Sequence, residues 1–146
     1  MRKIAEIMSE DCVTVTPQSS INEAAVLMRD HDIGFVPVIE GRKLIGVITD
    51  RDLVIRGYSE NKNGSASVTE VLTSDVRTVS PDISVDEAAA IMSSGQIRRL
   101  PVVENGELKG VISLGDLAVR EIFVNEAGEA LSQISEHEVQ SQNFAH

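Results

Sequence analysis

The strongest constraint on the fold of this chain is an internal repeat at a fixed offset of 64 residues. Aligned on itself without gaps, the stretch Ile4–Arg56 matches Val68–Arg120 at 21 of 53 positions. The clearest copies are GVITDRDL at Gly46–Leu53 and GVISLGDL at Gly110–Leu117. A chain of 146 residues with this self-similarity is predicted to contain one structural unit built twice.

Each copy has the same succession of expected elements. In the first copy, Ser20-x-x-Glu23 has capping-box spacing, and apolar residues follow at the i, i+3, i+4 and i+7 positions of a helix. Two apolar runs of strand length come next, joined by a short turn that in the second copy contains Asn-Gly, a strong hairpin signal. The predicted elements of the first copy are an extended segment 13–15, a helix from 21, strands 35–39 and 44–48, and a helix 52–56. The order is therefore β-α-β-β-α, twice, and the fold class is α+β.

A single copy of about 55 residues buries too little apolar surface to be comfortably stable alone, so the two copies are expected to pack sheet to sheet as an intramolecular pseudo-dimer. The polar, Gly- and Ser-rich segment after the first copy is predicted to be a surface linker. The predicted organisation is repeat 1 at 1–57, linker at 58–67, repeat 2 at 68–121, and a C-terminal helix with a polar tail at 122–146. The apolar stripe of that helix needs a partner, either its own chain or a second copy, and we favour a homodimer.

Charge and composition exclude several classes of partner. The net charge of −10 disfavours duplex DNA and anionic membranes, both of which require a basic face. No segment has the apolar length of a signal peptide or a membrane span, and the single cysteine, Cys12, allows no intrachain disulfide, so a cytoplasmic location is expected. Cys12 is expected to be a buried structural thiol.

The ordered motifs T-V-x-P, S-(I/V)-x-E-A-A-x-x-M, P-V and G-V-I-(T/S)-x-x-D-L, present twice, resemble the CBS domain. Two in tandem resemble the CBS pair called a Bateman module, and the resemblance covers Met1 to about Arg120. It implies a regulatory module that binds AMP, ADP, ATP, S-adenosylmethionine or NAD in clefts between the two repeats. It also implies a disc-like homodimer and a regulated enzyme or transporter as a partner, with no obligatory cofactor.

The resemblance assigns the ribose-binding carboxylates to Asp52 and Asp116, since a carboxylate can accept hydrogen bonds from both ribose hydroxyls. It places the hydroxyls of Thr49 and Ser113 against sugar or phosphate. Both pairs also fit a purely structural role, in which the hydroxyl caps the helix that follows. The two roles are compatible.

The two copies differ in the charged residues near these positions. The family architecture implies arginines as the phosphate contacts, since a guanidinium binds phosphate at two points; the alternative is that these arginines pair with surface acids. Residues beside them are expected to wall the base or, alternatively, to pack in the core. The phosphate candidates are Arg51, Arg98 and Arg99, the wall candidates are Ile33, Gly34 and Ile97, and Phe35 is a further ligand-binding candidate. We expect the site of Ser113 and Asp116, with Arg98 and Arg99, to prefer the more phosphorylated ligand.

Two functions follow as hypotheses. The first is a ligand sensor that passes nucleotide occupancy to a partner protein. The second is a constitutive dimeric scaffold with vestigial clefts. The sequence has no nucleophile–base arrangement, no phosphate-binding glycine loop and no metal-ligand spacing, so neither an enzyme nor a metal site is expected.

Overall fold

The computed structural model describes residues 2–118, and these form two compact units. We call them the Asp52 unit, which comprises 11–77 with 105–108, and the Asp116 unit, which comprises 2–10, 78–104 and 109–118. The segment 68–77 therefore packs with the elements of the first sequence repeat, and 2–10 packs with those of the second. A repeat in the sequence and a compact unit in the structure divide the chain at different places.

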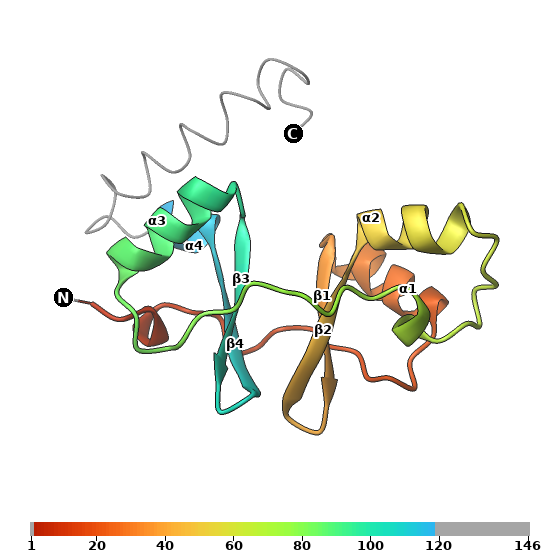
Figure 1. Ribbon diagram of the computed structural model, residues 1–146, viewed down its shortest axis with the longest axis horizontal. Coiled ribbons are helices and arrows are strands. Elements are labelled where there is room, and N and C mark those ends of the chain that lie inside the picture. Colours follow the sequence, from red (N-terminus) through yellow and green to blue (C-terminus); the bar gives the residue numbers. More distant parts are fainter. Residues whose placement is uncertain (1, 119–146) are drawn as a thin grey trace, which may run out of the picture. The chain divides into compact units, whose positions relative to one another are not determined.

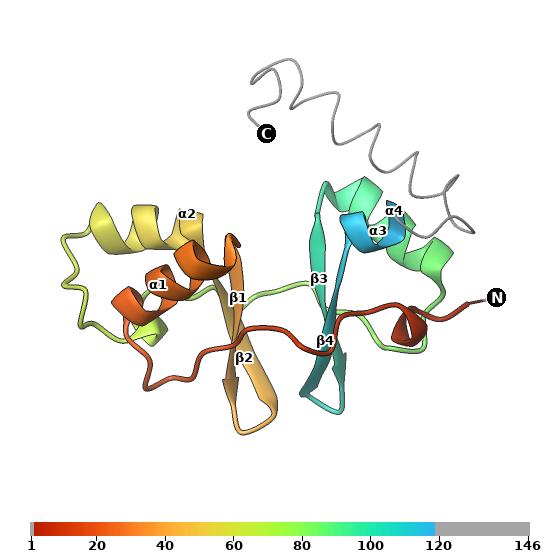
Figure 2. The same ribbon diagram turned by 180° about the vertical axis from the view of Figure 1, so that it is seen from behind.

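The Asp52 unit is a hairpin with helices against it, as Figures 1 and 2 show from opposite sides. Its strands pair antiparallel, with Phe35 opposite Thr49, and α1 contacts both β1 and η2. Val15 adds a parallel bridge to Val38 on one edge, and Thr73 adds an antiparallel bridge to Val47 on the other. The elements are α1 (Ile21–His31), β1 (Phe35–Glu40), β2 (Lys43–Thr49), α2 (Asp50–Asp52), η2, a π-helical segment (Leu53–Tyr58), and η3 (Val68–Glu70).

The Asp116 unit repeats this plan. Its two strands are hydrogen-bonded neighbours, and α3 contacts α4. Val79 bridges Val102 in parallel, and Ser9 bridges Val111 antiparallel. The elements are η1 (Ile4–Glu6), α3 (Val85–Gly95), β3 (Arg99–Glu104), β4 (Glu107–Ser113) and α4 (Leu114–Ala118). The predicted α+β class and the β-α-β-β-α order of each copy are confirmed.

Local chemistry explains where these elements begin and turn. Ser20 and Ser84 accept hydrogen bonds from the backbone N–H groups three residues ahead, which satisfies a donor that a helix start leaves free. The turn after β3 holds both Asn105 and Gly106 at positive φ, 55° and 80°, the geometry of a type I′ hairpin. The predicted caps and the predicted Asn-Gly turn are confirmed.

Each unit has its own apolar core, and the predicted helix stripe faces it. In α1 the stripe residues Ala24 and Met28 are buried, and Ile21 and Ala25 are half-buried. The four stripe residues of α3 are all buried: Val85, Ala88, Ala89 and Met92. The segments that join from outside the repeats contribute to these cores: Val68 and Val71 are buried in the Asp52 unit, and Ile4 in the Asp116 unit. Core packing therefore explains why each compact unit contains a short segment that belongs to the other sequence repeat.

The duplicated glycine of the GVI(T/S) phrase is explained by the edge segments. A Cβ atom on Gly46 would lie 2.6 Å from the carbonyl oxygen of Thr73, and one on Gly110 would lie 2.7 Å from that of Ser9. Both values are well below van der Waals contact, so only glycine allows the edge segment to pair with the strand at this point. The same requirement in both units accounts for the same residue in both copies.

Within residues 2–118, no helix has the length and apolar character needed to cross a membrane. The predicted C-terminal helix and tail at 122–146 lie outside the described residues.

Candidate ligand-binding site

The switch from β2 to α2 is held by a reciprocal capping box. The Asp52 N–H donates to Thr49 Oγ1 at 3.1 Å, and the Thr49 N–H donates back to Asp52 Oδ2 at 3.0 Å. This arrangement fixes both side chains at the end of the strand. The predicted capping role of Thr49 is confirmed. The two predicted ligand groups, the Thr49 hydroxyl and the Asp52 carboxylate, lie one helical turn apart.

Asp52 has a further partner that the sequence analysis missed. The Thr73 hydroxyl lies 3.1 Å and 3.2 Å from the two carboxylate oxygens of Asp52, and the carboxylate-bearing residue is only 7% exposed. A buried carboxylate requires such partners, because desolvation without them is costly. The signal that could have drawn attention to Thr73 is the repeat itself, which aligns Thr73 with Ser9, a second hydroxyl residue at the same position of the other copy.

Arg56 fixes the segment that carries Thr73. Its Nη1 donates to the carbonyl of Leu72 at 2.8 Å and reaches that of Val71 at 3.4 Å. The end of η2, the edge segment and the Asp52 carboxylate are thus linked by consecutive hydrogen bonds.

The Asp116 unit has the same capping box but a more open carboxylate. The Asp116 N–H donates to Ser113 Oγ at 3.0 Å, and the Ser113 N–H donates to Asp116 Oδ2 at 3.0 Å. Asp116 is half-buried rather than buried, and Ser9 is exposed. Across residues 2–118, no hydrogen bond joins Ser9 to Asp116, so this carboxylate keeps more of its acceptor capacity than Asp52 does.

In each unit, the loop before the first strand meets the switch after the second. The Asp50 N–H donates to the Gly34 carbonyl at 3.1 Å, and the Leu114 N–H donates to the Arg98 carbonyl at 2.8 Å. Each unit therefore gathers its own predicted ligand residues at one end of its hairpin. The two sets are Ile33, Gly34, Phe35, Thr49, Arg51 and Asp52 in one unit, and Ile97, Arg98, Arg99, Ser113 and Asp116 in the other.

The wall candidates are only partly available to a ligand. Ile33 and Ile97 are half-buried and pack against the cores of their units, which agrees with the structural alternative. Phe35 is also half-buried. At Gly34, a Cβ atom would lie 2.8 Å from Asp50 Oδ2, so the group that approaches this glycine in the structure is the Asp50 carboxylate.

The three arginines are exposed. Among residues 2–118, the side chains of Arg51 and Arg99 form no ion pair, so pairing with surface acids is not what the structure shows for these two. Both guanidinium groups are available to an anion, a role that stays a prediction.

The remaining candidate groups carry no site of their own. Cys12 is half-buried and free, and burial raises the pKa of its thiol, with the Asp11 carboxylate adding to the effect. In the part of the chain that the structure describes, no three His, Cys, Asp or Glu side chains are grouped so as to hold a metal ion.

Comparison with known proteins finds one family in both sequence repeats. A family model described as "CBS domain" matches residues 4–57 and 68–121. The uncharacterized protein YlbB of Bacillus subtilis is 41% identical over the full length of both chains. The inosine-5'-monophosphate dehydrogenase of Korarchaeum cryptofilum is 41% identical over 83% of this chain, which corresponds to 25% of that enzyme.

Two solved structures are similar. A putative acetoin utilization protein (AcuB) from Vibrio cholerae has a TM-score of 0.78 and 31% identity, covering 88% of this chain and 96% of that one. The CBS domain pair of protein MJ0100, solved in complex with 5'-methylthioadenosine and S-adenosyl-L-methionine, has a TM-score of 0.68 and 28% identity, covering 81% and 94%.

Proposed function

The chain belongs to the CBS domain family, and on that premise we propose that it is a regulatory module that binds an adenosine-containing ligand and transmits its occupancy to a partner protein. The ligand class follows the MJ0100 CBS pair, whose structure contains two adenosyl compounds. The regulatory role is consistent with the family segment found within an inosine-5'-monophosphate dehydrogenase, of which this chain spans only a quarter.

The observation that carries the proposal is the meeting of two loops in each unit. In each unit the loop before the first strand is hydrogen-bonded to the strand-to-helix switch, where a capping box holds a carboxylate and a hydroxyl. In this proposal the carboxylate accepts from the ribose hydroxyls, and the arginines contact any phosphate. The open Asp116 carboxylate, with Arg98 and Arg99 near it, is the site that prefers the more phosphorylated ligand.

Thermal unfolding of the purified chain with ATP, ADP, AMP, S-adenosylmethionine or NAD tests the proposal. A ligand at 100 times its dissociation constant is expected to stabilise the folded chain by about 2.7 kcal/mol. Asp116→Ala is expected to remove most of the stabilisation by ATP, and Asp52→Ala less of it. If no adenosyl compound raises the unfolding temperature, the sensor proposal is wrong.

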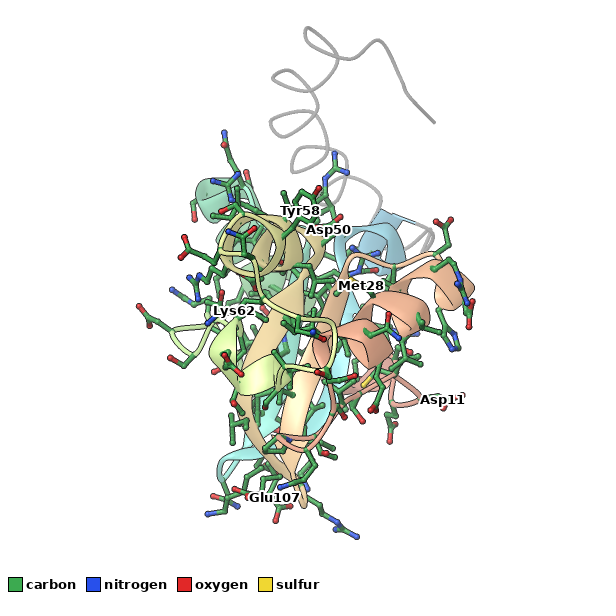
Figure 3. All side chains as sticks on the ribbon, turned by 90° about the vertical axis from the view of Figure 1, so that its right-hand side faces the viewer. Asp11, Met28, Asp50, Tyr58, Lys62 and Glu107 are labelled. Carbon is green, nitrogen blue, oxygen red and sulfur yellow. The ribbon has the colours of Figure 1, made fainter. Side chains whose placement is uncertain are left out.

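The second candidate is a constitutive homodimeric scaffold, and one observation favours it. Among residues 2–118 the exposed large apolar side chains are Val54, Ile55 and Tyr58, all on η2, with exposures of 56%, 50% and 84%. Figure 3 labels Tyr58 on the outer side of this helix. An exposed apolar patch of this kind suits a protein partner, and a second copy would supply one. A solution mass of one chain at micromolar concentration, measured by light scattering, would exclude the homodimer.

A further inference from the structure

Asp50 is an exposed residue at the strand-to-helix switch of the Asp52 unit. Its carboxylate Oδ1 accepts from the Arg51 N–H at 2.8 Å, and its own N–H donates to the Gly34 carbonyl at 3.1 Å. Its Oδ2 lies where a side chain on residue 34 would begin, 2.8 Å from the Cβ position. The carboxylate therefore lies between the loop of Gly34 and the first turn of α2, in the same turn as Thr49 and Asp52.

This placement occupies one of the backbone donors that an anion would use. The first three N–H groups of α2 donate to the Gly34 carbonyl, the Asp50 carboxylate and the Thr49 hydroxyl. A phosphate at this position would have to displace a carboxylate and then remain beside its charge. The Arg51 guanidinium forms no ion pair within residues 2–118, so Asp50 and Arg51 present one negative and one positive side chain next to each other in the sequence.

The Asp116 unit has the opposite character at the equivalent positions. Leu114 replaces Asp50, has no acceptor to offer, and is buried in the core with 3% exposure. Arg98 replaces Gly34, and Arg99 replaces Phe35. At Gly34 the space that a Cβ atom would approach is taken by the end of the Asp50 side chain, 2.8 Å away, so the Asp50 carboxylate lies against a residue that has no side chain of its own.

From this geometry we infer that Asp50 is a specificity-determining residue, which makes the Asp52 unit discriminate against phosphorylated adenosyl ligands in favour of those with a cationic 5′ substituent. This inference rests on the proposed function and assigns a ligand class to one of its two sites. S-adenosylmethionine has the matching chemistry, because its sulfonium and ammonium groups suit the Asp50 carboxylate and its own carboxylate suits the Arg51 guanidinium. Adenosine, without charge at this position, is the neutral reference.

The test measures binding to the full-length chain by titration calorimetry at low salt, in an Asp116→Ala background that weakens the other site. Adenosine, AMP and S-adenosylmethionine are compared in this background with and without Asp50→Asn. Asparagine keeps the acceptor for the Arg51 N–H and removes only the charge, so the turn is retained. The matched control is Asp11→Asn, an exposed aspartate of the same unit that lies well apart from Asp50 in Figure 3.

The background chain is expected to bind S-adenosylmethionine and adenosine more tightly than AMP. Asp50→Asn is expected to raise the affinity for AMP relative to adenosine by about fivefold or more, and to lower that for S-adenosylmethionine, from the loss of one charge about 5 Å from the ligand's charge. Asp11→Asn should change neither ratio.

The outcomes separate this inference from the proposed function. If the wild-type chain binds none of the three compounds, the proposed function fails and the inference with it. If the wild type binds them but the Asp116→Ala background binds none, or if Asp50→Asn leaves the AMP-to-adenosine ratio unchanged, the inference alone is overturned.

Discussion

Replacement of Gly46 by alanine is the sharpest test of how the Asp52 unit is closed. The added Cβ atom would lie 2.6 Å from the Thr73 carbonyl oxygen and 2.8 Å from Leu72 Cδ1. Leucine can change rotamer, but the carbonyl belongs to a backbone that is hydrogen-bonded in both directions to Val47, at 2.8 Å and 2.9 Å. The edge segment must therefore move away from β2 by several tenths of an ångström.

The size of the effect follows from these contacts. Overpacking against a backbone atom that cannot yield costs about 1–3 kcal/mol. An intact backbone hydrogen bond contributes about 1 kcal/mol, so partial loss of the two bonds between Thr73 and Val47 adds about 1 kcal/mol in total. We expect Gly46→Ala to lower the free energy of unfolding by about 2–4 kcal/mol, as the sum of these two terms.

Urea unfolding followed by circular dichroism measures this loss as a lower midpoint. Gly110→Ala should behave like Gly46→Ala, because its Cβ atom would lie 2.7 Å from the Ser9 carbonyl oxygen. Gly64→Ala is the matched control: its Cβ atom would meet only Asn22 Cβ at 3.5 Å, an ordinary contact, so it should be neutral or slightly stabilising. If Gly46→Ala unfolds within about 0.5 kcal/mol of the wild type, the steric explanation of the repeated glycine is wrong.

Two further predictions concern Thr73 and Cys12. Thr73→Val keeps the shape but removes the hydroxyl that donates to buried Asp52, and should cost about 1.5–3 kcal/mol in urea unfolding. Thr69 is exposed and its hydroxyl contacts the Ser67 hydroxyl, so Thr69→Val should cost little; equal stability of the two variants would contradict the assigned bond. Burial raises the pKa of the Cys12 thiol, so its alkylation by iodoacetamide at pH 8 should be slower than that of a small free thiol. The same shift stabilises the fold below the ordinary thiol pKa, and this contribution should be lost as the pH rises through the raised pKa. If the alkylation rate of Cys12 reaches half its maximum at a pH below the ordinary thiol pKa, the burial argument is wrong.

Features encoded by neighbouring residues were predictable from the sequence. The helix at Ile21–His31, the hairpin strands and the Thr49 cap each depend on residues within a few positions of one another, where periodicity and capping patterns apply. The boundaries were less predictable: the second helix was expected from residue 52, yet α2 begins at Asp50 and continues as the π-helical η2 to Tyr58. Hydrophobic spacing alone does not specify which hydrogen-bond register a helix adopts at its ends.

Among the candidate site residues, the local pairs were predictable and the distant partners were not. Thr49 with Asp52, and Ser113 with Asp116, follow from three-residue spacing. The bond from Thr73 to Asp52 spans 21 residues and depends on how the edge segment pairs with β2. The approach of the Asp50 carboxylate to Gly34 likewise depends on the register of the hairpin.

The sequence by itself determined that one β-α-β-β-α unit occurs twice, because a repeat at a fixed offset and local helix, cap and turn signals are properties of the linear chain. Only the tertiary structure decided which segments complete each unit: residues 68–77 pack with the first repeat's elements and 2–10 with the second's. The physical reason is that burial of Val68, Val71 and Ile4, and the glycine-dependent edge pairings, act between residues far apart in the chain, where no local pattern records them.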